Sequence, residues 1–332
     1  MTNISSKLTS SPGSKYINDQ NKWADYIELL CLLSTSGKIN ADELKNRLSD
    51  QAVGNAAGAL KEQDNTEVNQ EIETAEDKLD AKIRERFEFI SQRAIQFGDK
   101  YPFTFDPRTI TLNSKQITDD IYQPYLFYLL ASNLDYSREE LHNLTNVFEQ
   151  LSLSVSATMF KQQFKTLHFG TARPAGSEFQ GNGLERLTQL ANQLHLNLRT
   201  DIDNNAAISN THGDFGIDIV CYQEWGDNQS NAGLIFIQCG CGQDWVDKQL
   251  EAHSINQEKY FQFRNKPATA LFIPHSFRDA LNKWAYPTSL SDIIIIDRWR
   301  LLNLEITYSA ADIVKMRGLI DTLLQEKMGY FD

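Results

Sequence analysis

The sequence predicts an α+β or α/β protein in which a mostly helical N-terminal domain precedes an α/β sandwich. Apolar residues recur at helical spacing through much of residues 21–136. Further along, ATALFIP (268–274) and DIIIID (292–297) are apolar runs of strand length, as expected of buried strands in a sheet covered on both faces. Residues 213–248 contain two apolar runs joined by Gly, Asp, Asn and Ser, which predicts a β-hairpin. We therefore expect a helical domain over 21–136 and a second domain over 137–332.

The composition is that of a globular protein without a membrane-spanning segment. Hydrophobic residues make up 41% of the 332 residues. No apolar run approaches the roughly 20 residues that a membrane span needs. Residues 1–20 are rich in serine and lack an apolar core, so they predict a disordered tail and not a signal peptide. The net charge of −12 is unfavourable for binding nucleic acid, so such a function would need a partner subunit or a local basic groove.

The cysteines favour a reducing compartment. The chain has four, at positions 31, 221, 239 and 241. They are too few and too scattered for a disulfide framework, which favours the cytoplasm. Three of them together with His212 or His253 could form a zinc site, but structural zinc sites favour cysteine pairs roughly two to four residues apart. The Cys-x-Cys pair on one strand therefore supports buried thiols better than zinc.

The N-terminal domain is expected to contain helices and one small hairpin. The expected elements are a helix over 23–33 that stops at Gly37, a short helix that Asn40 caps and that reaches Leu48, a helix over 76–97, a hairpin over 101–112 and a buried helix over 122–134. Residues 49–75 are polar and predict a mobile connection that is helical in part. Two short helices around a glycine turn resemble the start of a winged-helix unit, with the hairpin as its wing, but the same pattern also fits a plain helical bundle.

A helix with one acidic residue of interest precedes the hairpin. Ser137 and Glu140 have the spacing of a capping box, which predicts a helix start. The inward stripe of this helix is Leu141, Leu144, Phe148, Leu151 and Val155. Glu149 lies beside that stripe. A Gly- and Pro-containing loop over 168–179 and a helix over 184–194 follow, and the sequence has no GxxxxGK[ST] or GxGxxG motif, so a nucleotide-binding P-loop is not expected.

The strand alternation groups polar residues of the hairpin. Successive strand side chains face opposite sides of a sheet. If the cysteines point into a buried layer, Asp218 on the first strand and Gln238 on the second point together to the opposite side. A carboxylate and an amide oxygen are hard ligands that suit Mg²⁺. The alternative is that both are solvated surface residues.

These residues carry a family resemblance. The order of a GDxGxD motif ending at Asp218, an apolar strand ending in Gln238 and a Trp-bearing helix resembles the core of the PD-(D/E)xK nuclease superfamily, in particular its restriction-endonuclease-like branch. The resemblance implies an α/β sandwich with a central mixed sheet. It also implies that Asp218 and Gln238 bind a divalent ion, and that Glu149 is the glutamate that such folds turn toward the metal from a preceding helix. A surface glutamate is the alternative for Glu149.

The sequence departs from the family at the lysine that helps to activate water. Gly240 occupies the usual lysine position, two residues after Gln238. Asp244 is a plausible N-cap for a helix starting at Trp245 and continuing to about residue 261. Lys248 would then lie in its first turn and could extend its flexible side chain over the site. A further helix over 277–286 and a closing helix over 310–328 complete the expected sandwich.

Three residues are candidates for nucleic-acid contacts. Arg298 and Arg300 follow the last apolar strand and could donate to phosphates, or could instead pair with Asp297 or Glu305. His212 precedes the GDxGxD motif and could contact the substrate.

The expected activity is Mg²⁺- or Mn²⁺-dependent hydrolysis of phosphodiester bonds, with DNA as substrate and RNA as the alternative. The arrangement is similar to nuclease subunits of prokaryotic anti-phage defence and restriction systems, which implies a partner subunit or a homo-oligomer. A second hypothesis is a subunit that keeps the fold for assembly or binding but has lost catalysis, which Gly240 and the acidic charge favour. A third is a transcriptional regulator that binds DNA through its N-terminal helices.

Overall fold

The computed structural model describes residues 11–12, 19–56, 65–112, 114–136, 141–160, 163–170, 178–200, 202, 213–304 and 308–325. The chain forms two compact units. The first comprises Met1–Arg138, Phe277–Ala285 and Met316–Asp332, and the second Glu139–Ser276 and Tyr286–Lys315. Two segments that we predicted in the C-terminal domain therefore belong to the first unit.

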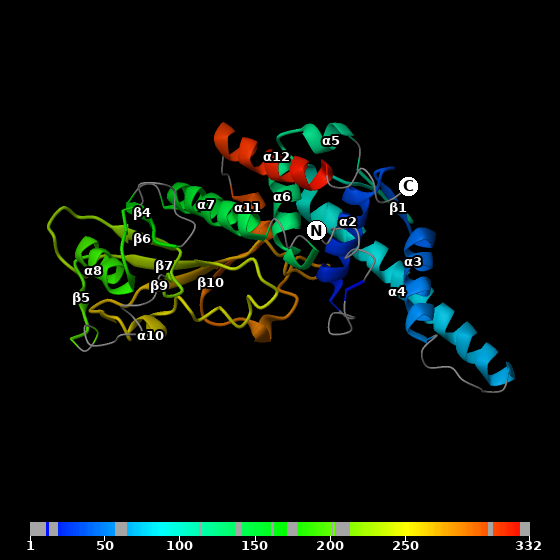
Figure 1. Cartoon of the computed structure of the whole chain (residues 1–332), viewed down its shortest axis with the longest axis horizontal. Coiled ribbons are helices and arrows are strands. Elements are labelled where there is room, and N and C mark those ends of the chain that lie inside the picture. The colour runs from blue at the N-terminus through cyan, green and yellow to red at the C-terminus, as the bar shows by residue number, and fades with distance from the viewer. Residues whose placement is uncertain are drawn as a thin grey trace. The chain divides into compact units, whose positions relative to one another are not determined.

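The first unit combines helices with a small antiparallel sheet (Figure 1). Its elements are α2 (Gln20–Leu33), β1 (Lys38–Asn40), α3 (Ala41–Ala56), α4 (Asn65–Phe97), the 3-10 helix η2 (Gly98–Lys100), β2 (Thr104–Asp106), β3 (Thr109–Thr111), α5 (Ser114–Thr118), α6 (Gln123–Ala131) and the 3-10 helix η3 (Leu134–Tyr136). The strands pair in the order β1-β3-β2. The predicted helical N-terminal region is confirmed, although a plain helical bundle does not describe it because β1 joins the hairpin.

Local sequence signals explain the helix boundaries in this unit. Asp19 accepts a hydrogen bond from the Lys22 amide and caps α2. Asn40 and Glu43 exchange side-chain and backbone hydrogen bonds in a capping box at α3. Gly37 ends the α2 turn with φ +63°, and a side chain there would collide with the carbonyl of Leu112. The partly helical character expected of residues 49–75 is confirmed, because α3 and α4 cover 49–56 and 65–75.

One later segment, Phe277–Ala285, is bonded to helices of the first unit. Gln96 and Asn21 donate to the carbonyls of Asp279 and Arg278, at 2.7 and 2.8 Å. The helix expected over 277–286 is wrong, since Arg278 and Trp284 form an antiparallel bridge there. Asp279 favours this turn because its carboxylate accepts the amide hydrogens of residues 281 and 283, which blocks the helical pattern.

The second unit is built on a five-stranded mixed sheet (Figure 1). Its elements are α7 (Leu141–Met159), β4 (Phe164–His168), α8 (Gly183–Gln193), β5 (Asn197–Leu198), β6 (Ile219–Gln223), β7 (Leu234–Cys239), α10 (Ser254–Gln257), β8 (Phe261–Gln262), β9 (Ala268–Phe272), the 3-10 helix η4 (Pro287–Ser289), β10 (Ile294–Ile296) and α11 (Arg298–Asn303). Helix α12 (Ala310–Gln325) spans the division between the units. The strand order is β10-β9-β7-β6-β4, and β5 pairs with β8 separately.

The predicted hairpin is the centre of this sheet. Strands β6 and β7 are antiparallel, with Ile219 opposite Ile237, while β9 and β10 run parallel to β7. Strand β4 adds to β6 antiparallel and was not predicted. The capping box expected at 137–140 lies outside the described residues. The α+β class is confirmed by the mixed sheet and the helices around it.

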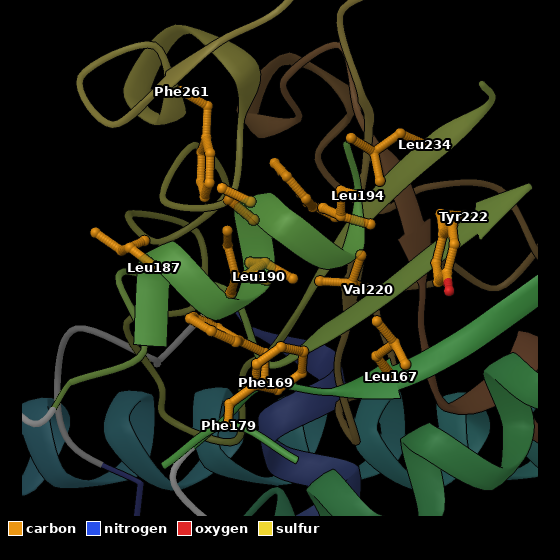
Figure 2. Packing of buried hydrophobic residues seen from close by; sticks show 14 of the residues in the cluster. Leu167, Phe169, Phe179, Leu187, Leu190, Leu194, Val220, Tyr222, Leu234 and Phe261 are labelled. Carbon is orange, nitrogen blue, oxygen red and sulfur yellow. The ribbon is translucent and has the colours of Figure 1, made fainter. Parts of the chain in front are cut away.

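Both faces of the hairpin are buried. On one face, Val220 and Phe236 pack with α8 in a cluster that Figure 2 shows around Leu187, Leu190 and Leu194. On the other face Ile219, Cys221, Ile235 and Ile237 are buried, and α7 contacts β4, β6 and β7. The polar residues therefore do not lie on an open face. They gather where β6 begins and β7 ends.

The helix expected from Trp245 to residue 261 is wrong. Residues 243–253 form successive turns, and only α10 is helical. Side-chain amides donate to backbone carbonyl groups that would accept main-chain hydrogen bonds in a continuous helix. Gln249 donates to the carbonyl of Val246, Asn256 to that of Leu250 and Gln257 to that of Glu251.

Candidate functional site

Hydrogen bonds of its backbone and its carboxylate hold Asp218 in place directly before β6. Its amide donates to the carbonyl of Ile237, and its carbonyl accepts from the amides of Phe169 and Gly170, both at 2.8 Å. Its carboxylate accepts the amide hydrogen of Cys239 at 2.7 Å. These bonds hold a carboxylate that is 7% exposed at the junction of three chain segments.

Glu149 projects from α7 to the same place. It is 7% exposed, although it lies at the edge of an apolar helix stripe. A methyl group at Gly170 would lie 1.8 Å from Glu149 Oε1 and 2.9 Å from Asp218 Oδ1. The two carboxylates therefore flank the backbone of Gly170, which is close enough to them only because glycine has no side chain. The predicted meeting of Glu149 and Asp218 is present in the structure.

The electrostatics of this pair favour binding a positive charge. Burial raises the pKa of Asp218 well above its usual range, and the charges of Glu149 and Asp214 raise it further. The Cys239 amide opposes this rise but does not overcome it. The Asp214 carboxyl group lies close enough to Asp218 to contribute to this rise. A cation at the site would oppose the rise, because it favours the ionised form of a carboxyl group.

Gln238 lies across the hairpin from Asp218. The register pairs Ile219 with Ile237, so the next pair at this end is Asp218 and Gln238. The Gln238 side-chain nitrogen donates to a carboxylate oxygen of Glu251. Its oxygen, Oε1, is buried and has no hydrogen-bond partner among the residues that the structure describes. A buried acceptor of this kind costs free energy unless a ligand, an ion or water meets it.

His168 is a site residue that the sequence reasoning assigned only to a loop. It ends β4, pairs with Ile219 in the register and bonds through Nε2 to Glu149 Oε1 at 2.5 Å. Its Nδ1 is buried, and no described residue forms a hydrogen bond with it. The alternating segment FKTLHF was the available signal for a strand that brings this histidine beside the hairpin.

The ammonium group of Lys248, which was expected at the site, is paired elsewhere. Lys248 forms an ion pair with Asp244 at 3.2 Å, and its side chain is 37% exposed. Burial, Asp218 and Glu149 raise the pKa of the Cys241 thiol, whereas Lys248 lowers it, so this ammonium and both site carboxylates act on one sulfur. The structure does not pair Lys248 with Asp218 or Glu149.

Gly240 explains why the family's usual lysine position is unsuitable here. A side chain at this position would point at the Cβ of Trp245 and the methyl groups of Leu271 and Ile273, at 3.3 to 3.6 Å. This is a packed apolar environment. An ammonium among these apolar groups would be desolvated.

Two of the other three candidates, Arg298 and Arg300, bond to backbone carbonyls. Arg298 is fully buried and donates to the Pro274 carbonyl at 2.8 Å, and Arg300 donates to the Ile295 carbonyl at 2.6 Å. Arg298 thus holds the backbone that follows β9, and Arg300 holds that of β10, so their expected role toward phosphates is not supported by these bonds. His212 lies outside the described residues.

The ligand set is smaller than a complete metal cage. In the part of the chain that the structure describes, no group of three or more His, Cys, Asp or Glu side chains is arranged to hold a metal ion. The candidate ligands are instead two carboxylates and one amide oxygen. The orphaned Gln238 oxygen and the close approach at Gly170 fit a small divalent cation, because hard oxygen ligands are what Mg²⁺ binds and water completes its coordination. The four cysteines are free.

Comparison of the chain with models of protein families, with curated proteins and with solved structures gave no match. Among the described helices, none has the length and apolar character that crossing a membrane requires.

Proposed function

We propose that the second unit is a divalent-metal-dependent nuclease that hydrolyses phosphodiester bonds of DNA. One observation carries the proposal: two buried carboxylates, from Glu149 and Asp218, meet over Gly170 at the end of a hairpin whose second strand offers an unpaired oxygen from Gln238. The setting in an anti-phage defence or restriction system rests on the resemblance to the PD-(D/E)xK superfamily alone.

The charge balance supports a dication in particular. Two ionised carboxylates and a neutral amide have a combined charge of about −2, which a dication neutralises. A bound divalent ion would activate water and stabilise the negative charge that develops on a phosphate. Glu149 and Asp218 would hold the ion, and Gln238 would add a neutral oxygen.

Neighbouring groups keep these ligands in place. His168 fixes one oxygen of Glu149, and the Cys239 amide fixes one oxygen of Asp218, so the free oxygen of each is directed by the fold. Lys248 would compensate charge on the substrate by leaving its exposed pairing with Asp244, which is worth little in water.

The packed surroundings of Gly240 favour a second candidate function. With no amine fixed on β7, the site could bind an ion or nucleic acid without cleaving it, as an assembly subunit would. The two functions differ in one measurable property, the turnover of a phosphodiester substrate.

The decisive experiment is cleavage of supercoiled plasmid and of single-stranded DNA and RNA by the full chain with Mg²⁺ or Mn²⁺. The comparison is with Asp218→Asn and Glu149→Gln, which keep shape and remove charge. Asp247→Asn is the matched control, because Asp247 is exposed in the same unit. We expect a loss of at least about 100-fold in the first two variants and none in the control.

Lys248→Ala and Lys248→Arg then test the cation. A nuclease that uses this ammonium loses rate in the first and retains part of it in the second, at unchanged ion affinity. If the unchanged protein binds Mn²⁺ but cleaves none of the substrates, the assembly function is correct and the nuclease proposal is wrong.

A further inference from the structure

A glutamate outside the carboxylate pair determines which atom Gln238 presents. A glutamine amide has an oxygen that can bind a cation and a nitrogen that cannot, and the two ends have nearly the same shape. Rotation by half a turn would therefore direct a hydrogen-bond donor at the ion. A glutamine ligand needs a neighbour that selects one orientation.

Glu251 is that neighbour in this chain. Its carboxylate is bonded to the nitrogen end of the Gln238 amide. An ionised carboxylate only accepts hydrogen bonds, so the nitrogen must face Glu251 and the oxygen must face away from it. The buried Oε1 without a partner is the consequence of this orientation.

The backbone of Glu251 is itself held against the segment that leads to Asp218. Gln257 is fully buried, and its side-chain nitrogen donates to the carbonyls of Glu251 and Phe215, at 2.8 and 2.9 Å. Gly216 has φ +78°, and a side chain there would lie 2.8 Å from the Cβ of Glu251. One buried glutamine and one glycine thus join the turn that carries Glu251 to the loop that carries Asp218.

We infer that Glu251 is a positioning residue, which orients the Gln238 amide so that its oxygen is available to the divalent ion. This inference rests on the proposed function, since it assigns a role toward the same ion. It also explains how a glutamine can serve as a ligand at this position. The carboxylate of Glu251 does not bind the ion itself but fixes the orientation of the amide that does.

The test is a double-mutant cycle with Mn²⁺ affinity as the readout, measured by calorimetry and by electron paramagnetic resonance on the full chain. Glu251→Ala is expected to weaken Mn²⁺ binding by about 10-fold or more. Glu251→Gln keeps an acceptor for the amide nitrogen and is expected to stay much closer to the unchanged protein. Glu258→Ala is the matched control, because Glu258 lies in the same stretch and pairs with Lys266.

The second arm repeats Glu251→Ala in a Gln238→Glu background. A carboxylate has two equivalent oxygens and needs no orienting partner, so the loss caused by Glu251→Ala is expected to disappear there. A merely structural role of Glu251 would weaken binding equally in both backgrounds, and that result would overturn the inference. Glu251 is exposed, so the variants are expected to fold, which thermal unfolding without metal checks.

The outcomes separate this inference from the proposed function. If the unchanged protein binds no Mn²⁺, the metal-dependent function is wrong and the inference with it. If the unchanged protein binds Mn²⁺ and Glu251→Ala binds it equally well, only the role of Glu251 is overturned.

Discussion

Two buried pairs of carboxylates, one in each unit, differ in whether an arginine compensates their charge. In the first unit, Asp25 and Glu28 both bond to Arg93, at 2.6 and 3.0 Å. The hydroxyl groups of Tyr101 and Tyr125 also donate to Glu28, both at 2.9 Å. In the second unit, no lysine or arginine among the described residues is paired with Glu149 or Asp218, and their polar partners include His168, the Cys239 amide and Asp214.

We propose that this difference separates a structural cluster from a binding site. Burial would lower the pKa of Arg93, but Glu28 and Asp25 raise it well above its usual value, so the first cluster carries its own permanent cation. The second cluster retains uncompensated negative charge, which raises the pKa of Asp218. A fold maintains such a cost where function needs it. The same residue types therefore have an arginine partner in the first unit, whereas in the second unit we propose that a bound ion supplies the positive charge.

Removal of the internal cation should have the largest effect. Arg93→Met leaves Asp25 and Glu28 buried without a positive partner, so we expect a loss of about 3 to 5 kcal/mol in the free energy of unfolding, or failure to fold. Urea unfolding measures it. Arg84→Met is the control on the same helix, because Arg84 is exposed and its replacement should change stability by no more than about 0.5 kcal/mol. Equal losses in the two variants would mean that the first cluster is not structural.

Removal of a charge from the second pair, Glu149 and Asp218, should increase the free energy of unfolding instead of decreasing it. Asp218→Asn keeps the acceptor for the Cys239 amide and removes a desolvated charge, so we expect a gain of about 0.5 to 2 kcal/mol without metal. Mg²⁺ should raise the melting temperature of the unchanged protein and leave that of the variant unaffected. Asp25→Asn should destabilise instead. A destabilised Asp218→Asn protein would show that this pair is structural as well.

The pH dependence of stability follows from the raised pKa of Asp218. Below its ordinary value of 3.8 both the folded and unfolded chains hold this proton. As the pH rises above that value the unfolded chain releases the proton first, so the free energy of unfolding falls until the folded pKa is passed. We expect the difference in the free energy of unfolding between Asp218→Asn and the unchanged protein to grow as the pH rises above the ordinary pKa of 3.8. Saturating Mg²⁺ should reduce the difference, and a constant difference would contradict the raised pKa.

The smallest effect on the fold should come from a glycine in the site. Gly170→Ala places a methyl group on Glu149 Oε1, which can move because it ends a side chain, so we expect a modest loss of stability and about a 10-fold loss of Mn²⁺ affinity. Gly318→Ala is the control, since nothing lies within 4 Å of a side chain there and the helix should gain up to about 1 kcal/mol. Unchanged Mn²⁺ affinity in Gly170→Ala would mean that the carboxylates do not bind the ion together.

Regular, local patterns were readable before the structure. The apolar runs Ile217–Trp225 and Gly233–Cys241 predicted the hairpin, and Asn40 was predicted as a helix cap. The cap at Asp19 was missed, because residues 1–20 were expected to be a disordered tail. The position of Glu149 beside its apolar stripe was also predicted. Turns such as those around Trp245 and Asp279 were mistaken for helices, because their distant amide partners and local carboxylate bonds have no periodic signature.

The sequence by itself determined the α+β class, the hairpin and the residue types able to bind a hard cation, because those depend on periodicity and on side chains a few residues apart. Only the tertiary structure decided that His168 bonds to Glu149, that Gly170 lets two carboxylates meet and that Glu251 directs the amide of Gln238. These contacts join segments that are separated in the chain, and chain folding alone brings such segments within hydrogen-bonding distance.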